Sequence, residues 1–242
     1  MNDKITFSEA LEKALLRSRE SIGTYKEKTL HHTLKIYYGG EFATEANVGK
    51  FIADVVRDDG IYEIQSKAFF RIKEKLKNFL SVTPVTVVYP IIVTKSILWT
   101  DTETGEIVSQ SKSPKKGSVY SILPELYALR EILKDQNLTF IAVLVKCDEY
   151  RYADGFGKDK KKRATKVDII PTEFVDEIKL SCIDDYKLFI PENLPENFTS
   201  HDYSKLTKLR VSDSQKALLV LTELGIVSRV GYRGRYLLYA VP

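Results

Sequence analysis

The N-terminal segment places apolar residues at helical spacing between charged ones. Apolar side chains recur every three or four positions at Phe7, Leu11, Ala14 and Leu15. This spacing predicts an amphipathic helix over residues 5–20. A second helix is predicted over residues 22–38, because the segment IGTYKEKTLHHTLKIYYG runs into Gly39-Gly40, a typical helix stop.

After this stop the pattern changes to that of strands. A short strand is predicted near residues 45–48, and two β-rich segments over 51–57 and 61–65 flank an Asp-Asp-Gly turn, a strong hairpin signal. Helical spacing returns over residues 67–80, and the nearly all-apolar VTVVYPIIV predicts a buried strand over residues 85–93. The predicted order is therefore α-β-β-β-α-β.

The middle of the chain is expected to extend the same sheet. Residues 96–117 predict a polar hairpin followed by a Ser-Pro-Lys-Lys-Gly stretch, and residues 121–135 predict a helix. A further apolar strand, LTFIAVLVKCDEYRY, is separated from its predicted partner VDIIPTEF by a lysine-rich loop over residues 154–166. The pattern up to residue 190 thus predicts an α/β domain in which helices flank a mixed sheet.

The last part of the chain predicts a second, smaller domain. The segment IPENLPENF, residues 190–198, has the prolines and asparagines of a linker. Helical patterns over residues 199–209 and 212–224 follow, with Ser212 as the expected cap of the second helix, and then two strands around Gly231–Gly234. Helix, turn, helix and two-stranded wing is the winged-helix pattern. The predicted domains are residues 1–190 and 199–242.

Composition narrows the class of protein. The chain has 242 residues, of which 43% are hydrophobic and 29% are charged, as is typical of globular proteins. No apolar run approaches the roughly 18 residues of a membrane span, and the charged N-terminus lacks a signal-peptide core. The two cysteines, Cys147 and Cys182, form no CxxC pair. We therefore expect a cytoplasmic protein with no membrane partner, disulfide framework or zinc knuckle.

Acidic residues interrupt the first predicted hairpin. Asp54 lies in its first strand, and Glu63 in its second. Because side chains alternate along a strand, Glu63, Gln65 and Lys67 are expected to share one face, and Asp54 can reach the same edge from across the hairpin. Two carboxylates and a backbone carbonyl, that of Ile64, can hold a hard cation such as Mg²⁺. Such a cation can activate water against a phosphodiester.

The order of elements, with Asp54 followed by Glu63-x-Gln65, resembles the PD-(D/E)XK nuclease superfamily, whose fold is that of restriction endonucleases. The resemblance covers residues 22–93 and implies that Asp54 and Glu63 bind the metal, Mg²⁺ or Mn²⁺, and that Glu27 of the first helix assists. In that family the last motif position is usually Lys and in some members Gln. The resemblance thus implies that Gln65 orients the attacking water and that Lys67 supplies the positive charge.

Basic residues gather in two places that suit a phosphate backbone. One is the lysine-rich loop, with Lys160, Lys161, Lys162 and Arg163. The other is the predicted winged helix, whose second helix and wing offer Ser212, Ser214, Gln215, Lys216, Arg233 and Arg235. We therefore expect a metal-dependent endonuclease that hydrolyses double-stranded DNA, and a homodimer is plausible for such an enzyme.

Other interpretations remain open at this level. The acids can simply keep a solvent-facing hairpin edge soluble. Gln65 in place of Lys favours a non-catalytic DNA-binding regulator on a degenerate nuclease scaffold, and a winged helix can also serve as a protein-docking module. The adjacent His31 and His32 project about 100° apart on a helix and cannot chelate one metal together.

Overall fold

A computed structural model describes residues 5–20, 28–40, 45–152, 154 and 164–242. The central sheet has six strands, in the order β3-β4-β5-β7-β8, with β6 also paired to β5. These strands are β3 (Val55–Arg57), β4 (Gly60–Ile64), β5 (Val85–Thr100), β6 (Ile107–Lys112), β7 (Leu138–Tyr152) and β8 (Thr165–Leu180). The chain is therefore an α/β protein with a mixed sheet, as the sequence predicts.

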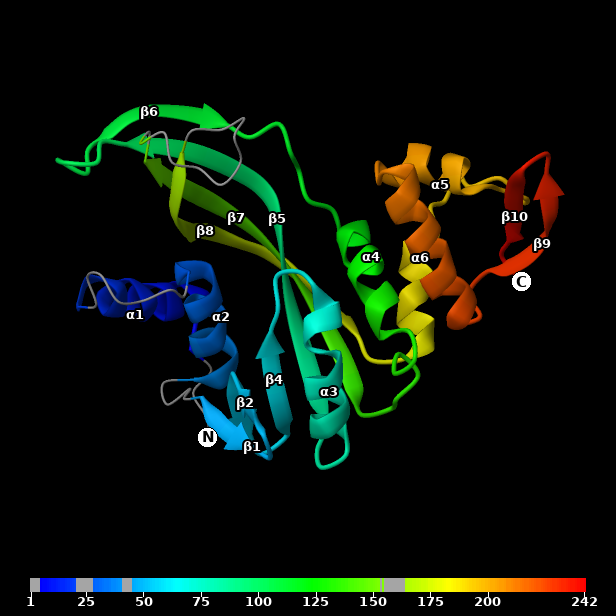
Figure 1. Ribbon diagram of the computed structural model, residues 1–242, viewed down its shortest axis with the longest axis horizontal. Coiled ribbons are helices and arrows are strands. Elements are labelled where there is room, and N and C mark those ends of the chain that lie inside the picture. The colour runs from blue at the N-terminus through cyan, green and yellow to red at the C-terminus, as the bar shows by residue number, and fades with distance from the viewer. Residues whose placement is uncertain (1–4, 21–27, 41–44, 153, 155–163) are drawn as a thin grey trace.

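Strand β5 carries different neighbours along its two halves. Its first half pairs in parallel with β4, and its second half pairs antiparallel with β6, so both lie on the same edge of β5. On the other edge β5 pairs in parallel with β7, which pairs antiparallel with β8. Beyond the end of β4 the long strands curve over the N-terminal helices (Figure 1). The short strands β1 (Ala46–Val48) and β2 (Phe51–Ala53) form a separate pair.

Helices cover both faces of the sheet (Figure 1). On one face lie α1 (Phe7–Glu20) and α2 (Thr29–Gly39), and on the other α3 (Lys73–Leu80) and α4 (Leu123–Leu126). Four 3₁₀ turns accompany them: Phe69–Arg71, Val119–Ile122, Tyr127–Leu129 and Ile183–Phe189. In the described ranges, every helix is too short or too polar to span a bilayer.

Helix α2 is held to β8 at both of its ends. At its start, Asp168 accepts hydrogen bonds from the Thr29 amide (2.9 Å) and from the Thr29 hydroxyl. At its end, the Tyr38 hydroxyl donates to Glu177 (2.6 Å). The N-cap residue of α2, Lys28, makes no side-chain cap bond. Asp168, from a distant strand, caps the helix in its place.

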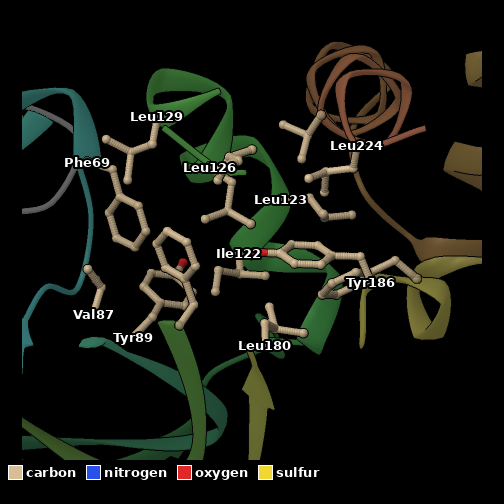
Figure 2. Close-up of a cluster of buried hydrophobic side chains, with 14 of the residues drawn as sticks. Phe69, Val87, Tyr89, Ile122, Leu123, Leu126, Leu129, Leu180, Tyr186 and Leu224 are labelled. Carbon is tan, nitrogen blue, oxygen red and sulfur yellow. The ribbon is translucent and has the colours of Figure 1, made fainter. Parts of the chain in front are cut away.

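The C-terminal segment packs on the far side of α4. It consists of α5 (Ser200–Thr207), α6 (Val211–Glu223) and the antiparallel strands β9 (Ser228–Arg233) and β10 (Tyr236–Ala240). Figure 2 shows Leu123 and Leu126 of α4 between the sheet residue Tyr89 and Leu224. One hydrophobic cluster includes residues from the sheet and from α6. The division into domains at residues 190–199 stays a prediction.

Three local predictions differ from the structure. The helix expected over 67–80 is a 3₁₀ turn followed by α3, and the one expected over 121–135 shortens to α4 with 3₁₀ turns on both sides. Helix α6 begins one residue earlier than expected, with Arg210 rather than Ser212 at its N-cap position. Residues 22–27 of the second predicted helix lie outside the described residues.

Gly60, at the end of the Asp58-Asp59 turn, offers a test of the hairpin. Its φ is +134°, and a Cβ there would lie 2.4 Å from the carbonyl oxygen of Pro84. We expect Gly60→Ala to lower the free energy of unfolding by about 3 kcal/mol, from backbone strain plus overlap. Gly105→Ala is the matched control, because φ there is +72° but nothing lies within 4 Å.

The control should cost only about 1 kcal/mol, the usual penalty for a left-handed non-glycine residue. Urea unfolding of both variants and the wild type measures the difference. Equal losses at the two positions would contradict the close approach of Pro84.

Candidate functional site

Asp54 and Glu63 lie opposite each other across the β3–β4 hairpin. Arg57 pairs with Gly60, and Val55 with Tyr62, so the same register places Asp54 opposite Glu63. Directly opposite residues in such a pair have Cβ atoms about 4.5–5.5 Å apart. The two-residue Asp58-Asp59 turn sets this register, which brings together the two acids singled out from the sequence.

Asp54 is surrounded by hydrogen-bond donors. Its Oδ2 accepts a bond from the Ile64 amide at 2.9 Å and lies 3.4 Å from the Nε2 of His31. The Lys35 ammonium of α2 is 3.7 Å from Oδ1. Burial alone would raise the pKa of Asp54, but His31, the Ile64 amide and Lys35 outweigh it and lower the pKa. Asp54 is therefore held as a carboxylate.

Glu63 differs from Asp54 in that its pKa is raised rather than lowered. It is 3% exposed, and its Oε1 pairs with the Lys75 ammonium of α3. Burial and the charge of Asp54 raise the pKa of Glu63 to about 7, against the opposing effects of Lys75 and of the Asp54 backbone amide. Its other oxygen, Oε2, is buried and has no hydrogen-bond partner within the described residues. A buried polar atom without a partner is unusual in a native protein and calls for an explanation.

Two carboxylates at this place could serve a Mg²⁺ ion. Mg²⁺ in proteins is commonly held by one or two carboxylates together with water and substrate phosphates. Glu63 Oε2 is one oxygen that needs a partner, and Asp54 supplies a second carboxylate. The Ile64 amide points to Asp54, so strand geometry directs the Ile64 carbonyl to the same edge. No group of three His, Cys, Asp or Glu residues suited to a metal occurs in the described ranges.

Pro90 determines where β4 leaves the sheet. Ile64 pairs with Val88 in parallel register, and the Gln65 amide donates to the Val88 carbonyl at 2.9 Å. The next bond of this ladder would run from the amide of residue 90 to the Gln65 carbonyl, but proline has no amide hydrogen. Strand β4 therefore ends at Ile64, and the chain turns away through Ser66.

Gln65 consequently lies just past the end of β4 and lines a pocket. The predicted strand alternation with Glu63 therefore does not extend to it. The pocket has a volume of about 310 Å³ and is formed by the start of α2, the end of β4, and strands β5 and β8. Gln65 and His31 line it, and Ile64 joins it to the acid pair. The Gln65 side-chain amide donates to the Lys67 carbonyl at 2.5 Å. The Lys67 side chain is exposed.

Three residues of this site were missed in the sequence: His31, Lys35 and Lys75. His31 appeared only as half of a His-His pair, yet it contacts Asp54. Lys75 was not selected from the sequence, yet it pairs with Glu63. A signal for Lys75 was available, because it directly precedes Leu76 at the border of the apolar stripe that faces the sheet. The partner of His31 depends on contacts between distant segments and had no local signal.

Several predicted site residues cannot be placed. Glu27 and the basic residues Lys160, Lys161, Lys162 and Arg163 lie outside the described residues. In the C-terminal segment, Ser212, Gln215 and Lys216 are exposed along α6, but Ser214 is fully buried. Ser214 is therefore not available for the groove contact that the sequence suggested, because its position in the helix turns it into the core.

The two predicted wing arginines have different surroundings. Arg233 donates to the carbonyl of Asn197 at 2.9 Å and lies 3.4 Å from an Asp202 carboxylate oxygen, so it ties β9 to α5. Arg235 stacks against the ring of Tyr236 and donates to its hydroxyl at 3.0 Å. Tyr232, which the sequence analysis did not select, is 71% exposed on the same hairpin.

The raised pKa of Glu63 predicts a pH effect on stability. The folded protein holds this proton more tightly than the unfolded chain, whose ordinary pKa is 4.5. The contribution of Glu63 to the free energy of unfolding is therefore fully present below pH 4.5 and is lost as the pH rises through about 7. Between about pH 5 and about pH 8, the free energy of unfolding of the wild type should fall by roughly 1–3 kcal/mol more than that of Glu63→Gln.

Urea unfolding in a chelating buffer measures this difference. Glu173→Gln is the control, because Glu173 forms a partly exposed ion pair with Lys146 and should follow the wild type. A parallel decline of wild type and Glu63→Gln would show that Glu63 is not held protonated by burial.

Comparisons with known proteins give a family but no activity. The chain is 32% identical over 150 residues to an uncharacterized protein of Treponema pallidum (strain Nichols), a match that covers 61% of this chain and 59% of that protein. The chain thus spans somewhat more than half the length of this relative. No solved structure matches. A model of a domain of unknown function, DUF8091, matches residues 28–181, which hold the sheet and the acid pair. The chain belongs to the DUF8091 family.

Proposed function

We propose that the protein is a metal-dependent nuclease that hydrolyses phosphodiester bonds of DNA, on a fold of the restriction-endonuclease type. The observation that carries this is the unpartnered oxygen of Glu63, buried opposite the carboxylate of Asp54. Two buried acids at close quarters repel each other when both are ionised, and a cation between them would remove that repulsion. Paired acids of raised and lowered pKa are also typical of catalytic sites.

The order of elements supports the proposal. Helix α2 is followed by the hairpin strands β3 and β4, by α3 and by β5, which pairs in parallel with β4. With β2 and β3 counted as one strand after β1, the order is α-β-β-β-α-β, as in the PD-(D/E)XK superfamily. Glu63 lies in β4, and Asp54 directly precedes β3, which is close to the placement that the resemblance implies.

Each residue of the site then has a role. Asp54, Glu63 and the Ile64 carbonyl would hold Mg²⁺, which supplies an activated water and stabilises developing charge on the phosphate. Lys75 provides the positive charge that Gln65 cannot, and it comes from α3 rather than from Lys67. His31 and Lys35 keep Asp54 ionised for the metal. Gln65 lies within the adjoining pocket, where its amide can orient substrate or water.

The C-terminal segment would hold the duplex as a winged helix. Its order of α5, α6 and the β9–β10 hairpin matches that architecture. Ser212, Gln215 and Lys216 form an exposed row on α6, and Arg235 lies beside the turn of the hairpin. Residues of these types suit contacts with phosphates and base edges.

Cleavage of plasmid DNA with Mg²⁺ or Mn²⁺ tests the activity. We expect Asp54→Asn and Glu63→Gln to lower the cleavage rate by at least about a hundredfold. A metal stabilises the transition state by several kcal/mol, and each change of about 1.4 kcal/mol in activation free energy changes the rate tenfold. Lys75→Met should lower the rate while Mg²⁺ binding by calorimetry persists. Glu173→Gln, in a partly exposed ion pair, should cut like the wild type.

The absence of both cleavage and metal binding across DNA and RNA substrates would refute the nuclease. The remaining candidate would then be a non-catalytic DNA-binding protein. One observation favours it: Gln65 replaces the usual lysine and lies past the end of β4.

Salt-dependent DNA binding tests whether the C-terminal segment contacts DNA, whether the protein is a nuclease or a non-catalytic DNA-binding protein. Lys216→Ala should weaken binding uniformly across sequences and reduce the slope of log affinity against log salt by about one. Lys187→Ala is the control, because Lys187 is an exposed lysine already paired with Asp184. Affinity that does not change with salt would instead favour a protein-docking role for this segment.

A further inference from the structure

The pocket beside the acid pair is joined to it by two direct contacts. His31, in its wall, lies 3.4 Å from Asp54, and Ile64, also in its wall, donates its amide to the same carboxylate at 2.9 Å. A group bound in the pocket would therefore lie next to the place where the metal is proposed. The pocket exists because Pro90 ends the ladder between β4 and β5.

The walls of the pocket are mostly aliphatic with polar groups on one side. The aliphatic lining consists of Leu30, Ile64, Pro90, Ile92 and Ile169. Gln65, Ser66 and His31 add hydrogen-bonding groups. The bond from Gln65 to the Lys67 carbonyl uses only one of the two N–H groups of its amide. Such a pocket suits a flat ring with apolar faces and polar edges, and a volume of about 310 Å³ is enough for one such ring.

Positive charge continues from the pocket along the strands. Lys28, in the pocket wall, donates to the backbone carbonyls of Lys166 and Val167, which are neutral acceptors. Farther along β5, β7 and β8, the single carboxylate of Glu149 is shared by three cations: Lys95 at 2.5 Å, Arg151, and Lys166 at 3.6 Å. The three cations outnumber the carboxylate, and Lys166, whose side chain is 61% exposed, is open to a phosphate.

We propose that this pocket binds one unpaired nucleobase and that the phosphates next to it follow Lys28, Lys166 and Lys95. The preferred nucleic acid would then have a single-stranded or unwound segment at the site rather than an intact duplex. Extracting a base from a duplex costs a few kcal/mol, and the cost is smallest where the base is already unpaired. The position of the cut relative to that base rests on the proposed nuclease function, but the binding preference does not.

Binding to oligonucleotides in a chelating buffer tests the pocket without cleavage. The probes are one sequence as a single strand, as a duplex with a short unpaired gap, and as a blunt duplex, each with 2-aminopurine at successive positions. The full-length wild-type chain should bind the first two at least about tenfold more tightly than the blunt duplex. The fluorescence should change at one position of the strand, where the base leaves its stacked neighbours.

Ile92→Trp should abolish both effects by filling the pocket, while Val175→Trp, at an exposed position of β8 outside the pocket, should leave them unchanged. Gln65→Leu is a second variant that keeps the size of the side chain but removes the amide, and it should reduce discrimination among bases at the same position. Circular dichroism confirms that each variant is folded. Replacing Lys28 and Lys166 by Gln should lower the salt slope by about two.

Equal affinity for single strand and duplex would overturn the proposal, as would an Ile92→Trp variant that is folded and unchanged in its preference. A free nucleoside monophosphate that binds as tightly as the oligonucleotide would also overturn it, because the ligand would then be a small molecule. A further outcome is that the wild type binds unpaired DNA preferentially without cutting any substrate, and that Ile92→Trp loses this preference. This result would refute the proposed nuclease activity and support the proposed base-binding pocket.

Discussion

The missing amide hydrogen of Pro90 is the constraint on which the site depends. Without it the β4–β5 ladder stops at Ile64, and farther along the same edge of β5 pairs with β6 instead. The Ile64 amide faces the other edge of β4, toward β3, where it donates to Asp54. The break in the sheet thus produces the pocket, next to the acid pair that the hairpin register brings together.

Helix α2 completes this arrangement because it is fixed to β8 rather than to its neighbours in sequence. Asp168 caps its first residue and Glu177 accepts a bond from its last turn, so the helix cannot slide along the sheet without breaking both. This position brings His31 and Lys35 to Asp54. The family match, residues 28–181, begins at the start of α2 and ends just after β8, so it encloses this pair of contacts.

Local patterns predict the sheet strands and the acid pair, because alternation and the Asp-Asp-Gly turn act over a few residues. The register that puts Asp54 opposite Glu63 follows directly from that turn. The cap from Asp168 could not be predicted, since the residues it joins are 139 positions apart. Lys75 and Ser214 show a related limit: helical periodicity gives the faces of a helix, but not which partner each face meets. Pro90 was visible within an apolar run, and its effect could be recognised only when its partner strand was known.

The charges around the hairpin come at a cost in stability. His31 and Lys35 lie close to Asp54, and Lys75 pairs with Glu63, so each acid has a basic side chain beside it. A pair of apolar residues at these positions would stabilise the sheet more, because buried ion pairs seldom repay the loss of hydration. The raised pKa of Glu63 and its unpartnered oxygen show that the lysine does not fully compensate the two acids. What the arrangement lacks is positive charge between the carboxylates, and a bound cation would supply it there.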